Sequence, residues 1–223
     1  MEPRYERNIP ALSEAECLIL RDKKALVVGC GGLGGHIIDQ LARIGIGALR
    51  VVDGDVFEES NLNRQLLSQV PLLGTGKAAA AAQHIERVNP DVPVEAVGDF
   101  LTEENAPRLL DGCHIVLDAL DNIPARRILA RACANAGIPY VFGGIQGWVA
   151  QAALSMPGDG LVEKLFPEDV VIRDRSVLSF TPALCAAMQV SLCVRWLVGR
   201  AVESATVSYF DLLNGEFETI PLA

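Results

Sequence analysis

Residues 26–39 read LVVGCGGLGGHIID: an apolar run, a cluster of glycines and then a helical pattern. Gly29, Gly31 and Gly34 satisfy the spacing G-x-G-x-x-G between a predicted strand and a predicted helix, so backbone N–H groups and the helix N-terminus can face a phosphate. Asp53 ends a second apolar run about twenty residues later, where a carboxylate reaches a ribose hydroxyl in nucleotide-binding α/β folds. The glycines predict the fold more firmly than the ligand, which is either a dinucleotide or a nucleoside triphosphate.

Apolar runs rich in β-branched residues alternate with helical patterns between residues 25 and 142. This alternation predicts an α/β fold with a mostly parallel sheet, because parallel strands need helical crossover connections. The expected strands are 25–28, 49–53, 94–97, 115–119 and 139–142, and the expected helices are the one from the glycine loop to residue 44, then 77–88, 103–110 and 126–136.

The pattern changes after residue 143. Segments 150–155, 206–212 and 216–222 predict antiparallel strands, the last two joined by a hairpin turn at Asn214-Gly215. Residues 158–175 are polar and lack periodicity, which predicts a long crossover loop. Segment 177–194 is uncharged over nearly the length of a membrane span, but Pro182 and Gln189 interrupt it, so we interpret it as a buried core helix.

These patterns predict one domain over residues 1–223. Its fold class is α/β, a Rossmann-like mostly parallel sheet with helices on both faces, extended by C-terminal antiparallel strands. We expect a helical arm at residues 1–22 and a crossover loop at residues 158–180.

Composition and charge limit the classes of ligand that the protein is expected to bind. The chain has 223 residues, 50% of them hydrophobic and 21% charged, with a formal net charge of −9. The acidic balance weighs against a protein that holds nucleic acid by neutralising phosphates, and it favours a small ligand or a protein partner. The charged N-terminal stretch MEPRYERNIP lacks an apolar core like that of a secretory signal, so we expect a cytoplasmic protein without a membrane segment.

Side chains downstream of the glycines favour a triphosphate. Arg64, within SNLNRQ (60–65), and Lys77, at a predicted helix start, could balance the charge of three phosphates, which a nicotinamide dinucleotide does not need. Asp121, within DALDN (118–122), could hold a magnesium ion that bridges those phosphates. Such groups follow successive strands, where open α/β sheets bind their ligands.

The order of these motifs resembles that in the ThiF/MoeB/HesA adenylyltransferases, bacterial relatives of the ubiquitin-activating enzymes. The motifs that carry this resemblance are RYERN (4–8), GCGGLG (29–34), D-x-D (53–55), SNLNRQ (60–65), Lys77 and DALDN (118–122), and they span most of the chain. The resemblance implies that ATP and Mg²⁺ are used to activate the C-terminal glycine carboxylate of a small ubiquitin-like carrier protein ending in Gly-Gly, giving an acyl-adenylate and pyrophosphate.

The resemblance also implies residue roles. Gly32, Asn61, Arg64 and Lys77 would lie at the phosphates, Asp53 at the ribose and Asp121 at magnesium. Arg7 matches an arginine that in relatives reaches the ATP of the other subunit, which implies a homodimer. The implied catalytic residues are Arg7, Arg64, Lys77 and Asp121, and the implied nucleotide-binding residues are Gly29, Gly31, Gly32, Gly34, Asp53, Asp55, Asn61, Arg64, Gln65, Lys77 and Asn122. Asp118 either caps the strand end or binds metal.

The sequence departs from the family in its cysteines. The six cysteines form no C-x-x-C pair, so we expect no structural zinc and a crossover loop that is mobile without a partner. The stretch VVIRDRSVLSF (170–180) has no cysteine where some relatives carry one for sulfur transfer. Cys185 lies in a predicted buried helix, where burial raises the thiol pKa. We therefore expect adenylation without an enzyme thioester.

Three other functions remain open at this point. GDFLTEEN (98–105) and the GG-x-x-G element (143–147) resemble the tRNA threonylcarbamoyl-adenosine dehydratases, whose substrate the acidic balance disfavours. The others are an NAD-dependent oxidoreductase and a non-catalytic nucleotide-binding partner subunit. The sequence does not identify the carrier protein or the pathway, whether thiamine, molybdenum or tungsten cofactor, cysteine or another product.

Overall fold

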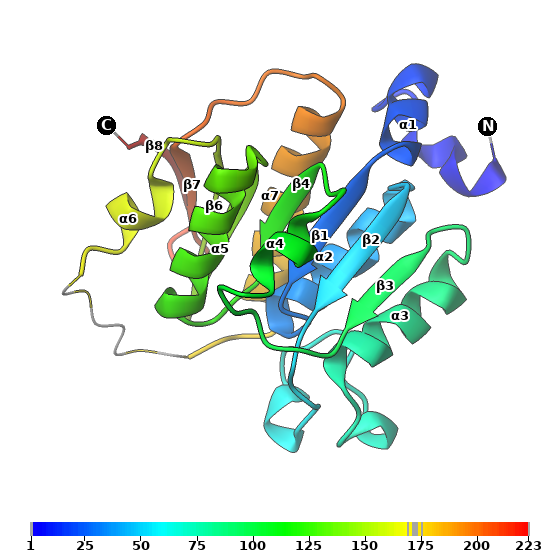
Figure 1. Cartoon of the computed structure of the whole chain (residues 1–223), viewed down its shortest axis with the longest axis horizontal. Coiled ribbons are helices and arrows are strands. Elements are labelled where there is room, and N and C mark those ends of the chain that lie inside the picture. The colour runs from blue at the N-terminus through cyan, green and yellow to red at the C-terminus, as the bar shows by residue number, and fades with distance from the viewer. Residues whose placement is uncertain (1, 169, 171–173, 175, 223) are drawn as a thin grey trace.

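The structure, a computed structural model, describes residues 2–168, 170, 174 and 176–222 (Figure 1). The strands are β1 Lys24–Val28, β2 Ala48–Val52, β3 Val94–Val97, β4 Ile115–Asp118, β5 Tyr140–Gln146, β6 Val149–Ser155, β7 Thr206–Asp211 and β8 Glu216–Pro221. They form an eight-stranded sheet in the order β3-β2-β1-β4-β5-β6-β7-β8. The predicted fold class is confirmed.

The sheet changes direction at β6. Strands β3, β2, β1, β4 and β5 are parallel, whereas β6, β7 and β8 each run antiparallel to the preceding strand. In the parallel half, Val28 pairs with both Val52 and Asp118, so β1, β2 and β4 end side by side. We call this row of strand ends the carboxyl edge.

Helices cover both faces of the sheet (Figure 1). Their bounds are η1 Pro3–Asn8, α1 Glu14–Arg21, α2 Gly32–Ile44, η2 Glu59–Asn61, η3 Val70–Leu72, α3 Lys77–Val88, α4 Ala106–Leu110, α5 Ile123–Ala136, α6 Leu161–Leu165 and α7 Phe180–Leu197. One apolar core lies under α2, α3 and α7, and a second lies under α4, α5 and α6. The central parallel strands β1, β2 and β4 are therefore buried on both faces, as their apolar sequences require, whereas β3 at the edge of the sheet is partly exposed.

The core helices follow from their sequences. In α2, Ile37, Ile38 and Leu41 are fully buried at helical spacing, and Gly45 ends the helix in the left-handed conformation with φ +92°. By length and composition α7 could cross a membrane, but half of it is buried within the protein, where it packs against α2, β5 and β6. The prediction of a core helix for most of this segment is confirmed.

Some boundaries differ from the sequence prediction. Helix α5 begins at Ile123, earlier than expected, because the Asn122 side chain caps it through the amide of Ala125 at 2.9 Å. Strand β5 extends to Gln146, and α4 begins only at Ala106. Helix α6 lies where a loop was expected, since Leu161 and Val162 bury its short apolar face. Residues 169, 171–173 and 175 of the expected crossover loop lie outside the described residues.

The N-terminal arm, η1 and α1, packs at the far end of the sheet from the carboxyl edge (Figure 1). Tyr5 is buried against Gly45, where an added Cβ would come within 2.7 Å of the ring. The Tyr5 hydroxyl accepts a hydrogen bond from the buried Asn89 amide at 2.8 Å. At the opposite side of the molecule, β8 forms the outer strand, and each of its residues is exposed.

Candidate nucleotide site at the carboxyl edge

The glycine loop is closely packed between β1 and α2. Gly29 adopts φ +100°, and a Cβ there would lie 2.5 Å from the carbonyl oxygen of Ala119. A Cβ on Gly34 would lie 1.8 Å from the carbonyl oxygen of Gly29. Both positions therefore exclude any side chain. Helix α2 begins at Gly32 without a side-chain cap, so the N–H groups of its first turn can donate to a phosphate.

Asp53 is held against this loop at the end of β2. Its Oδ2 accepts from the Cys30 amide at 2.7 Å, and its Oδ1 accepts from the Asp55 amide at 2.8 Å. Burial raises the pKa of the Asp53 carboxyl, and the two amide donors oppose that rise. Each carboxylate oxygen keeps a lone pair that can accept from a ribose hydroxyl.

Lys77 is held by the segment after β2. It begins α3 and is 8% exposed, with its Nζ 3.1 Å from Asp55 Oδ2. Its backbone amide donates to the Asp55 carbonyl at 2.9 Å. Asp55 therefore orients the lysine in this structure. A buried ammonium group at a helix start can meet the negative charge of a phosphate.

The SNLNRQ segment lies over the glycine loop. Gln65 is buried, and its amide lies 3.5 Å from where a Cβ on Gly31 would be. The Arg64 methylene chain lies beside Gly32, and its guanidinium donates to the Ser60 carbonyl at 3.0 Å and to Asn63 Oδ1 at 2.9 Å. Asn61 caps the turn at η2 by accepting from the Glu58 amide at 3.0 Å. The Arg64 side chain thus lies beside the N-terminus of α2, whereas Asn61 shapes the segment.

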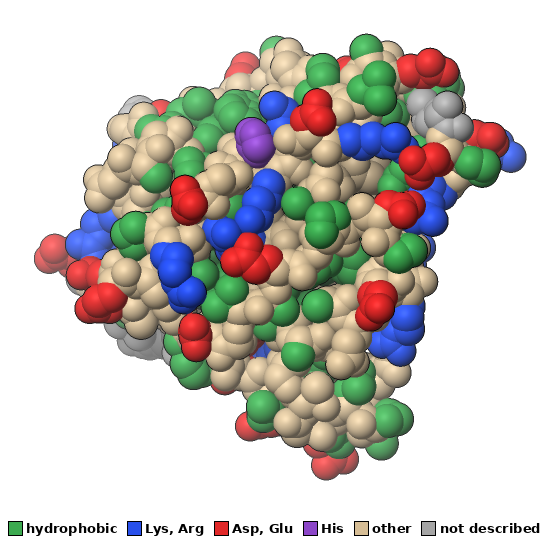
Figure 2. Space-filling view, turned by 45° about the vertical axis from the view of Figure 1, so that its right-hand side comes forward, with side chains coloured by type: hydrophobic (Ala, Val, Ile, Leu, Met, Phe, Trp, Pro, Cys, Tyr) green, Lys and Arg blue, Asp and Glu red, His purple; other side chains and the backbone are tan. Residues whose placement is uncertain are grey.

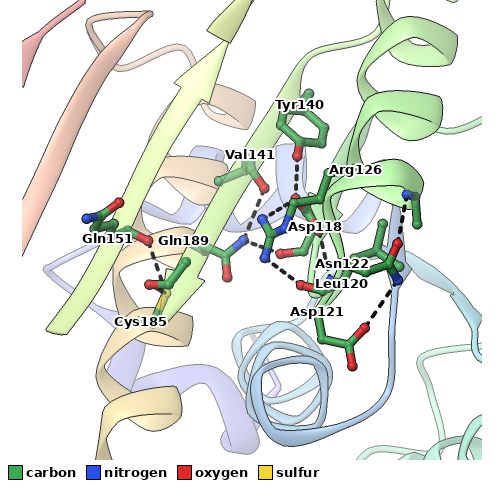
Figure 3. A network of polar contacts seen from close by, with 12 residues as sticks. Asp118, Leu120, Asp121, Asn122, Arg126, Tyr140, Val141, Gln151, Cys185 and Gln189 are labelled. Carbon is green, nitrogen blue, oxygen red and sulfur yellow. Dashed lines mark hydrogen bonds and ion pairs between the residues drawn. The ribbon is translucent and has the colours of Figure 1, made fainter. Parts of the chain in front are cut away.

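Asp121 and Asn122 lie next to the glycine loop along the carboxyl edge. Both side chains are exposed, and Asn122 Nδ2 donates to Asp121 Oδ1 at 3.3 Å (Figure 3). Ala119, from the same loop, contacts the glycines directly. The Asp121 carboxylate is therefore open to a cation beside the glycine loop.

Asp118 is not available as a metal ligand. It is fully buried, and its Oδ2 lies 2.6 Å from Arg126 Nη1 and accepts from the Tyr140 hydroxyl (Figure 3). Burial raises the pKa of this carboxyl, and Arg126 and Tyr140 oppose the rise. The alternative in which Asp118 binds metal is thus disfavoured.

Arg7 lies away from the other predicted site residues. Its side chain is exposed on η1, on the arm at the far end of the sheet. Within one chain the structure brings together the glycine loop, Asp53, Lys77, Arg64 and the 118–122 loop, but not Arg7.

Cys185 is a poor candidate for a nucleophile. It is fully buried in α7, with its Sγ 3.2 Å from the Gln151 carbonyl oxygen (Figure 3). Burial raises the pKa of this thiol to about 12. A thiol that is neither exposed nor ionised near neutral pH does not attack an acyl group.

Arg126, Tyr140 and Gln189 are residues of this region that the sequence analysis missed. They come from α5, β5 and α7, and no local motif joins them. The sequence signal that could have pointed to Arg126 is its place one helical turn after Asn122, a residue type that commonly caps helices.

Cavities formed by the described residues also lie away from the carboxyl edge. One, of about 120 Å³, lies between the arm and α2, and its lining includes Tyr5, Cys17 and Leu18. Another, of about 240 Å³, lies between α5 and α6. Neither lining includes the glycine loop, Lys77 or Asp121.

On the face of the molecule shown in Figure 2, acidic, basic and hydrophobic side chains are interspersed.

Comparisons with solved structures agree with this fold. E. coli MccB with ATP superposes with a TM-score of 0.82 at 18% identity, covering 100% of this chain and 72% of that one. PaaA superposes with a TM-score of 0.82 at 21% identity, covering 98% and 72%. At these identities the likeness concerns the fold.

Relatives found by sequence share more identical residues with this chain than the solved structures do. The SAMP-activating enzyme E1 of Haloferax volcanii is 36% identical over 210 residues, which cover 91% of this chain and 77% of that protein. The adenylyltransferase and sulfurtransferase MOCS3 of Xenopus laevis is 32% identical over 98% of this chain, which spans about half (51%) of it. The ThiF family model matches residues 5–223. The chain therefore belongs to the ThiF family.

Proposed function

We propose that this ThiF-family chain, an ATP-dependent adenylyltransferase, activates the C-terminal glycine carboxylate of a small ubiquitin-like carrier protein. The observation that supports this most is the meeting of Lys77, Arg64 and the uncapped N-terminus of α2 at one edge, beside the open carboxylate of Asp121. The two cations Lys77 and Arg64 can balance the charge of a triphosphate, which a dinucleotide does not require. The proposal places the enzyme in the cytoplasm.

The reaction needs no enzyme nucleophile. A carboxylate oxygen of the carrier attacks the α-phosphorus of ATP while the bond to the bridging oxygen of the β-phosphate breaks, so acyl-adenylate and pyrophosphate form without proton transfer. The chain's part is to position the two reactants and to stabilise the charge that accumulates on the phosphate oxygens. Asp53 orients the ribose, and Lys77, Arg64 and the α2 N–H groups face the phosphates.

The residues present fit magnesium bound together with ATP. Asp121 supplies one open carboxylate, and among the described residues no group of three His, Cys, Asp or Glu side chains is placed to hold a metal by itself. Mg²⁺ commonly binds through one or two carboxylates together with substrate phosphates and water. When bound, it would neutralise phosphate charge, and Asp121 would hold it.

Three further features belong to the proposed function of this enzyme. No structural zinc is required, adenylation proceeds without an enzyme thioester, and the active unit is a homodimer in which Arg7 reaches the partner's ATP. The position of Arg7, exposed and distant from its own chain's site, supports a role in trans.

ATP–pyrophosphate exchange tests the proposal. Exchange should require a carrier protein that ends in Gly-Gly and should disappear when those two glycines are removed, because the tail supplies the attacking carboxylate. Stimulation by modified tRNA without any carrier-dependent exchange would instead favour the dehydratase. Tight ATP binding without turnover with any carrier would favour a non-catalytic partner subunit.

A further inference from the structure

Both neighbours of Asp121 are held in place, although Asp121 itself is exposed. The Leu120 amide donates to Asp118 Oδ1 at 2.8 Å, and the Leu120 carbonyl accepts from Arg126 Nη2 (Figure 3). On the other side, Asn122 caps α5 by accepting from the Ala125 amide. The backbone that carries the candidate metal ligand is therefore fixed from both directions.

Arg126 links the two sides of this arrangement. It lies one turn after Asn122 on α5, and its guanidinium reaches back to the Asp118 carboxylate and to the Leu120 carbonyl at once. Asp118 is held in turn by Gln189, whose amide donates to the Asp118 carbonyl at 2.9 Å. The chain thus anchors the 118–122 loop to α5 and α7 through buried polar contacts.

Aromatic rings brace the guanidinium. The Arg126 Cζ atom lies 4.9 Å from the centroid of the Phe142 ring and 5.9 Å from that of Phe166. The neighbouring Arg127 donates to the Phe166 carbonyl at 2.8 Å, which holds the end of α6 in the same cluster. These contacts leave Arg126, 7% exposed, with little freedom to take another rotamer.

We propose that Arg126 is a positioning residue for the metal-binding edge of the nucleotide site, and that it acts on Asp121 through Leu120 and Asp118. This inference rests on the proposed function, in which Asp121 holds magnesium with ATP. Groups that orient a metal ligand without touching the metal commonly change metal affinity about 10–100-fold. Nothing in the arrangement places Arg126 at the reacting atoms.

The proposed role depends on the forked shape of the guanidinium, which lets Arg126 contact Asp118 and Leu120 at the same time. Arg126→Lys keeps the charge beside Asp118, but a single ammonium group cannot replace the two directed contacts to Asp118 and Leu120. The loop should then lose its fixed geometry while the ribose and phosphate contacts of Asp53 and Lys77, made by other elements, remain. Arg131→Lys is a matched control on the same helix, because Arg131 is an exposed side chain paired with Glu103 at 2.9 Å.

Calorimetric titration of the full chain with ATP, without carrier protein, tests the proposal by a measurement other than activity. Titrations in MgCl₂ and in EDTA give the gain in ATP affinity that magnesium supplies. In Arg126→Lys this gain should fall about tenfold, while the affinity in EDTA stays within about twofold of wild type. Arg131→Lys should match wild type in both. An unchanged gain in folded Arg126→Lys, or an equal loss in both conditions, would overturn the proposal.

Phe166→Leu is a second variant that leaves the buried ion pair intact. It should reduce the magnesium-dependent gain about twofold to threefold, and adding it to Arg126→Lys should cause no further loss, because the ring acts through the guanidinium. Additive losses would contradict this route. If Arg126→Lys fails to fold, Phe166→Leu decides alone, and an unchanged gain then overturns the proposal.

These titrations distinguish a failure of the Arg126 role from a failure of the proposed carrier-activating function. A wild-type chain that gains ATP affinity from magnesium but shows no carrier-dependent exchange contradicts the proposed substrate and leaves the role of Arg126 standing. A wild-type chain whose ATP affinity is indifferent to magnesium contradicts the role of Arg126.

Discussion

Single residues at the carboxyl edge differ in how firmly the fold holds them. Asp53 and Lys77 are held by hydrogen bonds to Cys30 and Asp55, whereas the Asp121 side chain is exposed at the end of a fixed backbone. Such a side chain contributes little to packing. Its replacement therefore separates function from stability.

Asp121→Ala should lower ATP–pyrophosphate exchange by about a hundredfold or more, because the charge on the phosphates loses its metal partner. Stability should change by no more than about 0.5 kcal/mol, as for other surface positions. Exchange assays together with thermal unfolding check both expectations. Exchange at the wild-type rate in a folded variant would remove the metal role of Asp121.

Cys185→Ala should leave exchange close to the wild-type rate while lowering the melting temperature by a few degrees. The thiol is buried, and its pKa is raised to about 12, so its loss affects packing in α7 and not chemistry. Steady-state exchange and calorimetric melting measure the two effects. Complete loss of exchange in a folded protein would restore a thioester step.

At the scale of elements, the sequence predicted segments whose signals are local. The glycine loop with α2, the alanine-rich α3 and the apolar parallel strands all follow from periodicity and capping within a few residues. Helix α6 was missed because five residues are too few to show a period, and its burial depends on contacts with α5. The local parts of the candidate site were predictable for the same reason.

The rest of the site depends on contacts between distant segments. Asp118, Arg126, Tyr140 and Gln189 come from four elements, and their mutual contacts arise only when the sheet and its two helix layers are assembled. No spacing in the sequence marks them as a group. The separation of Arg7 from the remaining site residues likewise depends on which end of the sheet the arm packs against.

Helix α1 offers a pH-dependent contact between elements. Glu16 binds Arg200 at 2.6 and 2.9 Å, and hydrogen bonds from Arg200 and Ser13 lower the pKa of its carboxyl to about 2. A depressed carboxyl pKa stabilises the folded state above the unfolded pKa of about 4.5, and that stabilisation is lost as the pH falls toward 2.

Glu16→Gln should therefore lower the melting temperature slightly at pH 7 and make it fall less steeply between pH 4.5 and pH 2 than in wild type. Melting curves across this range measure the slope. Arg131→Gln provides a comparison, because it breaks the exposed pair of Arg131 and Glu103 and leaves the Glu16 contact unchanged. A slope identical to that of wild type would show that the Glu16 contact does not contribute in solution.

At the scale of the whole molecule, the arm and the candidate nucleotide site occupy opposite ends of the sheet (Figure 1). Tyr5, held by Asn89 and Gly45, fixes the arm to the α2 and α3 ends. A single chain cannot bring Arg7 to its own ATP without dismantling this packing. The proposed homodimer resolves that separation.

Mixing two inactive variants tests whether Arg7 of one subunit acts at the site of the other. Arg7→Ala and Asp121→Ala should each lack exchange, but a refolded equal mixture should recover about a quarter of the wild-type rate. About half of the dimers in the mixture are heterodimers, and each restores one of its two sites. Arg7→Ala mixed with itself is the control. No recovery despite exchange of subunits would exclude the role in trans.

The exposed outer strand β8 has a consequence for the protein in concentrated solution. Its outward backbone N–H and C=O groups could extend the sheet by pairing with a strand from another molecule. Phe217 and Ile220 are exposed there, but Glu216 and Glu218 interrupt the apolar surface and Pro221 lacks a donor. These three residues oppose strand-to-strand association into fibres. Replacing Glu218 with a β-branched apolar residue would therefore lower solubility and favour polymerisation.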